Sequence, residues 1–296
     1  MVEELLTRCE LPARGDALVC GVSGGADSLA LLALAVAAGC VVTAVHVDHG
    51  LREGSGGEAA LVARVATQLG AGFRAEQVGV TSGPGLEARA RAARHAVLGA
   101  DAALAHTADD LAETMLLNLV RGSGLDGLTR LRPGRRHPIL RLRRTETEAV
   151  CASIGVEPFL DPSNLDPAFA RNRVRREVLP LLVDVAGGRD VVALLARTSD
   201  LLAADADALD ILAAAAVPDV CDARTMAGAP PALAARAVRE WLAAAGPGGS
   251  EHHPPSAAAV ARVLAVARLE VGACELAGGW RVARTAGRLR LVEPSN

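Results

Sequence analysis

Residues 23–28 have the sequence SGGADS; they follow the apolar run ALVCGV and precede an apolar stretch with helical spacing. This order is typical of a strand, a tight loop and a helix. A helix N-terminus presents unpaired N–H groups and about half a positive charge, and adjacent glycines let the backbone close around an anion. We therefore expect the loop to bind a phosphate group; in a simpler alternative, Asp27 or Ser28 only caps the helix. The residues of the loop are Ser23, Gly24, Gly25, Ala26, Asp27 and Ser28.

The chain contains no lysine, so all 31 of its basic residues are arginine. A Walker A loop is excluded, because its lysine has no candidate. The dinucleotide fingerprint G-x-G-x-x-G does not fit either, because Gly24 and Gly25 are adjacent and two polar residues, Asp27 and Ser28, come soon after them. The loop is therefore a phosphate site of another kind.

A second group of candidate residues lies in the stretch ALAHTADDLAET, residues 103–114. A short strand is expected to end at His106, and Asp110 and Glu113 then lie three residues apart on one face near the start of a helix. Thr107 and Asp110 form a local capping-box pattern, and early acids suit the helix dipole. The functional alternative is a carboxylate pair that holds a magnesium ion or an ammonium group. From the residues alone, both explanations stay open.

Two further groups could face a bound phosphate. The apolar run at 41–47 predicts a buried strand, and Asp48 and His49 follow it; ligands bind at the carboxyl ends of strands in open α/β sheets, so we expect both beside the loop. A polar turn is the alternative for these two. In the predicted helix 86–98, Arg91 and Arg94 share a face and either reach a phosphate or lie in solvent.

Arginines are concentrated in two segments, although a net charge of -3 gives no global reason to bind nucleic acid. Residues 130–144 contain seven arginines and no acid, and residues 171–176 contain four arginines. Such segments have affinity for polyanions, and two of them on an acidic protein suggest one nucleic-acid face. The candidate RNA-binding residues are Arg130, Arg132, Arg135, Arg136, Arg171, Arg173, Arg175 and Arg176.

The order of elements predicts an α/β fold, a Rossmann-like parallel sheet with helices on both faces, followed by a helical linker and a small α+β domain. A long Ala/Leu helix is expected at 187–216, and short strands near the C-terminus. The predicted domains are 1–186, which carries the loop, 187–219, the helical linker, and 220–296, a small domain that binds RNA or substrate.

The bulk composition is that of a soluble globular protein, with 51% hydrophobic and 22% charged residues. Six scattered cysteines without a C-x-x-C motif disfavour a zinc ribbon, an iron–sulfur site and a disulfide framework. The N-terminus lacks the layout of a signal peptide, and no membrane span is expected. We expect a cytoplasmic protein, and both a monomer and a homodimer are open.

The SGGADS loop resembles the pyrophosphate-binding loop of the ATP pyrophosphatase (PP-loop) superfamily. Over residues 17–182 the chain resembles the tRNA(Ile)-lysidine synthetase family, and its last domain is similar to that family's short substrate-binding domain. NRVRREVLP and ADDLAET are the most specific stretches. Thr107 and Leu111 stand where many relatives have His and Gln. The matching stretches are SGGADS, VDHGLR, GLEARARAARH, HTADDLAET, RGSGLDGL and DPSNLDPAFARNRVRREVLPLL.

The resemblance implies a two-step modification of the wobble cytidine in the CAU anticodon of an isoleucine tRNA. ATP adenylates the C2 oxygen with release of pyrophosphate, and the ε-amine of free L-lysine then displaces AMP. It implies ATP and Mg²⁺ as cofactors, with Asp27 on the metal side, and Asp110 and Glu113 binding the ammonium and taking its proton. Arg91 or Arg94 would stabilise the adenylate, and the arginine-rich segments would hold the RNA.

Two other classes of function compete with this one. The first is another reaction of the superfamily, either tRNA thiolation or an amidation. The scattered cysteines disfavour thiolation, and amidation leaves the arginine segments without a role. The second is a non-catalytic RNA-binding module that senses adenine nucleotides.

Overall fold

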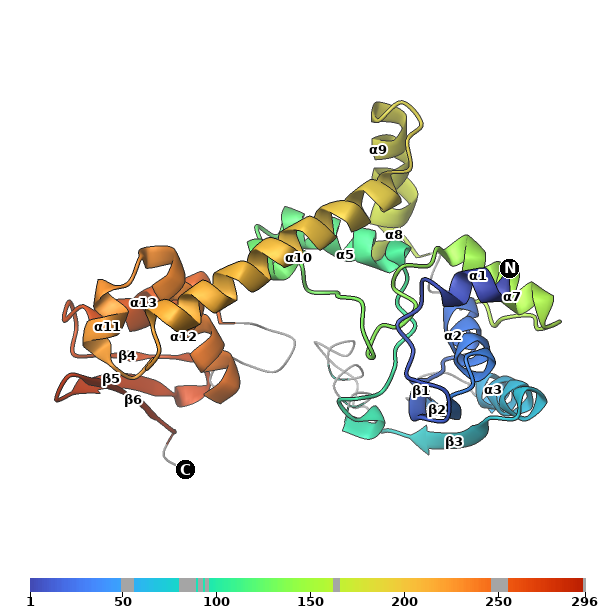
Figure 1. Cartoon of the computed structure of the whole chain (residues 1–296), viewed down its shortest axis with the longest axis horizontal. Helices are drawn as coiled ribbons and strands as arrows, with labels where there is room; N and C mark the ends of the chain where they lie inside the picture. The colour runs from blue at the N-terminus through green and yellow to red at the C-terminus, as the bar shows by residue number, and fades with distance from the viewer. Residues whose placement is uncertain are drawn as a thin grey trace. The chain divides into compact units, whose positions relative to one another are not determined.

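The computed structural model describes residues 1–48, 56–79, 89, 93, 96–161, 166–245 and 255–294. The chain divides into two compact units, Met1–Leu202 and Ala203–Asn296 (Figure 1). The boundary falls inside the longest helix, α10 (Val191–Ala216). The finer domain limits expected from the sequence stay a prediction.

The first unit is built on a parallel sheet of β1 (Ala17–Gly21), β2 (Val41–Asp48) and β3 (Gly72–Gln77), in that order. Parallel neighbours need crossover connections, and α2 (Ala26–Ala37) and α3 (Gly56–Leu69) supply them. Side chains alternate along β2, so that Ala44 packs with the α2 side and Val45 packs with Leu98 on the other side. Residues 96–98 are helical, so both faces carry helical residues, as predicted.

The predicted strand ending at His106 is present only as a single bridge, which corrects that expectation. Ala103 N donates to Val19 O at 2.8 Å, and Gly21 N donates to Ala103 O at 2.9 Å. The next amide, Leu104 N, instead donates to Arg136 O at 2.8 Å. His106 N then donates to Leu104 O at 3.0 Å, so the chain turns there and the ladder beside β1 ends after one bridge.

The main core lies around α2, whose residues from Ser28 to Ala35 are all buried. A helix buried on every side needs neighbours on every side. The sheet covers one side, and α3 and α7 (Arg144–Ser153) pack on others (Figure 1). Because aromatic residues make up only 2% of the chain, leucine, valine and alanine fill this core.

A second core of the same unit joins three helical segments. α5 (Ala108–Val120) contributes Ala112 and Leu116, the π-helix η2 (Val174–Val178) contributes Val174, and the start of α10 contributes Val191. η2 lies between α8 (Ala170–Arg173) and α9 (Leu179–Val185). The short helices α1 (Val2–Leu6) and α6 (Leu125–Leu128) complete the described elements of this unit.

The described part of the second unit contains three α-helices, one short 3-10 helix and an antiparallel sheet after the end of α10, in agreement with the expected helices and short strands. The sheet has the order β4-β5-β6. Among the described helices of the chain, none has both the length and the apolar composition needed to cross a membrane. The elements are α11 (Ala223–Gly228), α12 (Pro231–Ala245), α13 (Ala257–Ala267), β4 (Ala273–Glu275), η3 (Ala277–Gly279), β5 (Arg281–Thr285) and β6 (Arg288–Val292).

Candidate active site

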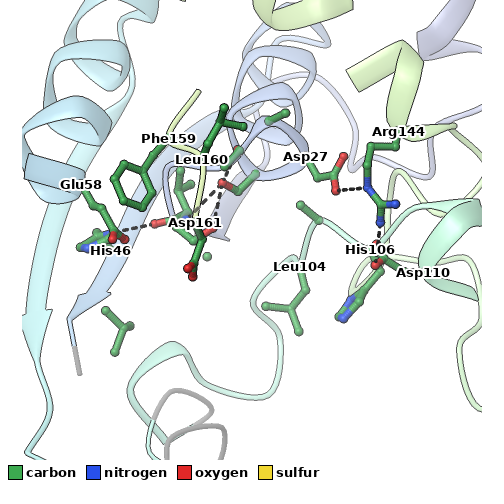
Figure 2. Close-up of a pocket in the computed structure, with 18 of the residues that line it drawn as sticks. Asp27, His46, Glu58, Leu104, His106, Asp110, Arg144, Phe159, Leu160 and Asp161 are labelled. Atoms are coloured by element: carbon green, nitrogen blue, oxygen red, sulfur yellow. Dashed lines mark hydrogen bonds and ion pairs between the residues drawn. The ribbon is translucent and has the colours of Figure 1, made fainter. Parts of the chain in front are cut away.

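A cavity of about 740 Å³ opens at the carboxyl ends of β1 and β2 in the first unit (Figure 2). Its wall is built from the loop before α2, the start of α5, the start of α7 and the arginine-bearing segment 171–176. Most of the described candidate residues line it. They are Ser23, Gly25, Ala26, Asp27, Ser28, Asp48, Asp110, Arg171, Arg175 and Arg176.

The loop before α2 has the geometry of an anion site. Gly24 has φ +89°, which favours glycine, and Gly25 occupies the N-cap position, where it has no side chain to cap the helix. Ser28 closes the loop, because its hydroxyl donates to Gly25 O at 2.8 Å and accepts from Ser23 N at 3.2 Å. Neither Asp27 nor Ser28 is the N-cap, no side chain caps the helix, and the first residues of α2 line the cavity, so this helix start is available to an anion.

Asp27 lies in the first turn of α2, and two side chains of α7 hold its carboxylate in place. Its Oδ1 accepts a hydrogen bond from the Thr147 hydroxyl, and its Oδ2 lies 3.6 Å from Arg144 Nε. Burial raises the pKa of Asp27 to about 6, and the nearby Asp110 carboxylate acts in the same direction. The Thr147 hydrogen bond and the Arg144 charge oppose that rise without cancelling it.

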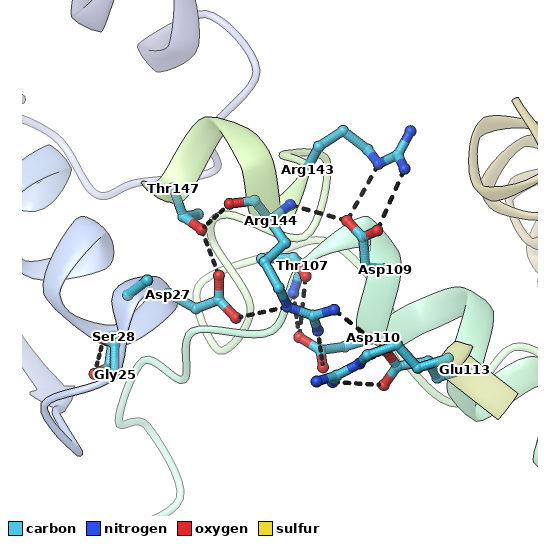
Figure 3. Close-up of polar contacts among 12 residues, drawn as sticks. Gly25, Asp27, Ser28, Thr107, Asp109, Asp110, Glu113, Arg143, Arg144 and Thr147 are labelled. Carbon is cyan, nitrogen blue, oxygen red and sulfur yellow. Dashed lines mark hydrogen bonds and ion pairs between the residues drawn. The ribbon is translucent and has the colours of Figure 1, made fainter. Parts of the chain in front are cut away.

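Asp109 fixes the start of α7 against the start of α5. Its Oδ2 accepts from Arg144 N at 2.9 Å and from Arg143 Nε at 3.1 Å. Burial alone would raise the pKa of Asp109, but the hydrogen bonds from Arg143 and from Arg144 N–H hold it below the ordinary value. The position of the Arg144 side chain therefore depends on a carboxylate that does not line the cavity and that faces Arg143 (Figure 3).

Glu113 and Asp110 lie in a cluster of guanidinium groups (Figure 3). Glu113 is fully buried, with Oε2 2.6 Å from Arg171 Nε and Oε1 2.7 Å from Arg175 Nε. Asp110 Oδ2 accepts from Thr107 N at 2.8 Å in a capping box, while its Oδ1 lies 3.1 Å from Arg171 Nη2. Asp110 thus has both of the environments that the sequence left open: it caps α5 and it faces the cavity.

The arginines predicted to bind RNA have different surroundings. Arg171 and Arg175 point inward to Glu113, whereas Arg173 is exposed and pairs with Glu177 at 2.9 Å. Arg176 is exposed and lines the cavity. Arg135 and Arg136 use one nitrogen each to bond main-chain carbonyl oxygens, and Arg130 is exposed. Their contact with RNA stays a prediction.

Three sequence candidates, His49, Arg91 and Arg94, lie outside the described residues, so their proposed roles stay predictions. The sequence interpretation did not single out Arg144 or Thr147 as site residues. The signal was their spacing, because residues three apart on a helix share a face and this helix follows directly on the arginine-rich segment.

The donor set fits magnesium held together with a nucleotide. Mg²⁺ is usually bound through one or two carboxylates plus substrate phosphates and waters. Asp27 and Asp48 both line the cavity next to the phosphate loop. Within the described part of the chain, no group of three His, Cys, Asp or Glu side chains forms a closed metal cage. Magnesium binding by Asp27 stays a prediction, and Asp48, at the end of β2, is a further carboxylate that lines the same cavity.

The fold and the loop define an α/β nucleotide-binding protein of the PP-loop class. The family model described as "PP-loop domain" matches residues 2–182, which implies that the chain uses ATP. The solved structure of the U34-tRNA thiolase NcsA from Methanococcus maripaludis is similar in fold, with a TM-score of 0.54 and 15% identity. That similarity covers 68% of this chain and 78% of the thiolase.

Two relatives narrow the class. The tRNA(Ile)-lysidine synthase of Nocardia farcinica is 47% identical over 246 residues, which cover 78% of this chain and 77% of the relative. That of Salinispora tropica is 42% identical over 315 residues, covering 96% and 93%. The chain belongs to the tRNA(Ile)-lysidine synthase family. The resemblance and the α/β fold expected from the sequence are thereby confirmed.

Proposed function

We propose that this protein ligates free L-lysine to C2 of the wobble cytidine of tRNA(Ile) with a CAU anticodon, through an adenylated cytidine, converting ATP to AMP and pyrophosphate. Family membership supports the reaction. The observation that carries it is one cavity lined by the phosphate loop, by Asp27 and by Asp110 of the carboxylate–arginine cluster.

In the first half-reaction, the cytidine oxygen attacks the α-phosphate and pyrophosphate leaves. The loop before α2 meets the growing negative charge with N–H groups that are already oriented, and electrostatic preorganisation of this kind is usually the largest catalytic contribution. Magnesium, when bound, neutralises phosphate charge. Asp27 and Asp48 would hold it. We also propose that Arg91 or Arg94 contacts the adenylate phosphate, and that His49 faces the nucleotide.

In the second half-reaction, lysine must lose a proton before it attacks. An ordinary lysine pKa of about 10.4 places the neutral amine about 4.6 kcal/mol uphill at pH 7. We propose that Asp110 and Glu113 bind the ammonium and accept that proton. Their present partners are the guanidinium groups of Arg171 and Arg175, so these carboxylates already bind cations, and the incoming ammonium must displace such contacts.

RNA binding would use the arginines that face outward. Chemistry on a base requires it to leave the anticodon stack, and phosphate contacts can hold the backbone while it does so. Arg130, Arg135, Arg173 and Arg176 are exposed and are the best placed for this role. A cytoplasmic location and a choice between monomer and homodimer stay sequence-based predictions.

Neither competing function gains support from the described residues. No cysteine of the described part lines the cavity, which disfavours thiolation there. Amidation leaves the exposed arginines without a role. A non-catalytic nucleotide sensor would bind RNA without releasing pyrophosphate.

The test is incorporation of labelled lysine into tRNA transcripts with ATP and Mg²⁺. We expect label in the CAU transcript, none in a transcript with the wobble cytidine replaced by guanosine, and one pyrophosphate released per lysine. An Asp27→Asn variant should bind the tRNA and incorporate no lysine. Absence of label with the wild-type protein would refute the proposal. If the wild-type protein released no pyrophosphate and the Asp27→Asn variant bound RNA with wild-type affinity, the nucleotide sensor would be favoured.

A further inference from the structure

One face of α7 forms part of the active site. Arg144, Thr147 and Cys151 are spaced at i, i+3 and i+7, so they lie along one face of the helix. The Thr147 hydroxyl donates to Asp27, and Cys151 Sγ lies 3.4 Å from Ala26 O. This face of α7 therefore packs along the first turn of α2, next to the phosphate loop.

Arg144 contacts three carboxylates from two other helices. Its Nε lies 3.6 Å from Asp27 Oδ2 on α2. Its Nη2 lies 3.3 Å from Asp110 Oδ1, and its Nη1 lies 3.4 Å from Glu113 Oε1, both on α5. The side chain is only 22% exposed and lines the cavity, so these contacts are formed largely away from solvent (Figures 2 and 3).

We propose that Arg144 is a positioning residue that holds Asp27, on the nucleotide side of the cavity, in a fixed relation to Asp110 and Glu113 on the amine side. The assignment of a nucleotide side and an amine side rests on the proposed function, whereas the contacts of Arg144 with the three carboxylates are independent of it. A guanidinium is planar and presents its N–H donors in a rigid fork, so it can fix the spacing of several carboxylates; a lysine ammonium is a single point charge.

Arg144 is not redundant. Within the described residues, Glu113 keeps two arginine partners when Arg144 is removed, but Asp27 keeps no other ion pair. The cluster of Asp27, Asp110 and Glu113 faces Arg144, Arg171 and Arg175, which balances three negative charges with three positive ones. Loss of Arg144 leaves one excess negative charge where a triphosphate must bind, and among the described residues it leaves the Thr147 hydrogen bond as the remaining side-chain contact of Asp27.

The decisive experiment is a double-mutant cycle on MgATP affinity, measured by calorimetry with the full chain and without RNA. Arg144→Gln leaves one carboxylate charge uncompensated beside the phosphate loop, so it should weaken binding about 10- to 100-fold. Because Arg144 acts through Asp27, the double variant Asp27→Asn, Arg144→Gln should bind no more weakly than the weaker single variant. Multiplicative losses would mean that Arg144 contacts the phosphates by itself, and would overturn the positioning role.

Two further variants separate geometry from charge and from folding. Arg8→Gln is the control, because Arg8 pairs with Glu146 on the same helix α7 and does not line the cavity; MgATP affinity should stay within about twofold of wild type. Arg144→Lys keeps the charge and the fold, yet should recover only part of the affinity. Wild-type affinity in Arg144→Lys, or equal losses in Arg8→Gln and Arg144→Gln, would refute the proposal.

Turnover gives an independent readout. In Arg144→Ala, millimolar guanidinium should restore part of the lysine-incorporation rate, while the Michaelis constant for lysine should not rise, because Glu113 and Asp110 keep other cationic partners. If guanidinium did not restore the lysine-incorporation rate, or if the only effect of the substitution were a higher Michaelis constant for lysine, a role centred on Asp27 would be contradicted. If the wild-type protein forms no lysidine, the proposed function fails, but the ATP-binding cycle still decides the role of Arg144.

Discussion

Replacing Glu113 with glutamine should destabilise the first unit strongly, because it removes the charge that three guanidinium groups share. Glu113 is fully buried, and Arg171 Nε and Arg175 Nε approach it to 2.6 and 2.7 Å. Breaking a buried ion pair by removing one partner costs about 3–5 kcal/mol. The two arginines are 36% and 29% exposed and can be partly hydrated, so we expect a loss of about 3 kcal/mol in the free energy of unfolding.

The assay must follow the first unit alone. Both tryptophans, Trp241 and Trp280, lie in the second unit, so their fluorescence reports on that unit and serves as an internal control. Hydrogen exchange of the α5 and η2 amides reports on the first unit. A loss of about 3 kcal/mol should reduce protection of the slowest α5 amides about 150-fold, while the urea midpoint of the fluorescence transition should not change.

Glu177→Gln is the matched control for this prediction. Glu177 also pairs with an arginine, at 2.9 Å from Arg173, but both side chains are more than half exposed. Exposed pairs contribute little, since water and salt screen them. Equal protection of the α5 amides in the Glu113 and Glu177 variants would refute the conclusion that buried pairing with arginine stabilises this unit.

Three further predictions concern the loop, the helix junction and the RNA surface. Gly24→Ala should lower the free energy of unfolding of the first unit by about 1–2 kcal/mol and weaken MgATP binding, because φ at Gly24 is +89°. The added Cβ would lie 3.7 Å from Phe159 Cβ, so the strain comes from the backbone and not from a clash. Gly57→Ala, inside α3, is the control and should not destabilise the unit; the thermal unfolding midpoints of the two variants make the comparison. The pKa of Asp109 is lowered in the folded state, so its contribution is present above about pH 4 and is lost as the pH falls through the lower folded value. The urea midpoint for unfolding of the first unit should therefore fall more between pH 6 and pH 3 in the wild-type protein than in Asp109→Asn. Equal falls in the two proteins would contradict this prediction. Arg173→Gln should reduce the slope of log affinity for tRNA against log salt by about 1, and an unchanged slope would show that this arginine does not contact a phosphate.

Local patterns were enough to predict the elements that carry the loop. β1, the glycine loop and α2 follow from an apolar run, paired glycines and helical spacing, all within residues 17–37. The segment at 103–106 was different, because it makes one bridge to β1 and then turns: His106 N–H donates to Leu104 O, and Leu104 N–H donates to a distant loop carbonyl, Arg136 O. Nothing near residue 104 in the sequence specifies that partner.

The arginine pattern was equally informative and equally incomplete. Four arginines in 171–176 predicted a basic face, but the interpretation of the sequence did not divide these arginines between a buried side and an exposed side. Which side faces the buried Glu113 depends on packing of η2 against α5, and this is a tertiary property. For the same reason, the inward orientation of Arg144 was not predictable, since it requires Asp109 to fix the first residue of α7.

The exclusive use of arginine has a chemical consequence at this site. The proposed amine must be neutral to attack an activated cytidine, and any neutral amine nearby would compete with free lysine. Arginine is not deprotonated in proteins, so Arg144, Arg171 and Arg175 balance the charges of Asp27, Asp110 and Glu113 without offering a nucleophile. A lysine at any of these three positions would supply the same charge as an ammonium group, which can lose its proton and then act as a nucleophile toward the intermediate, whereas a guanidinium cannot. Substituting Arg171 with lysine therefore introduces a competing amine next to the carboxylates at which we place the substrate amine.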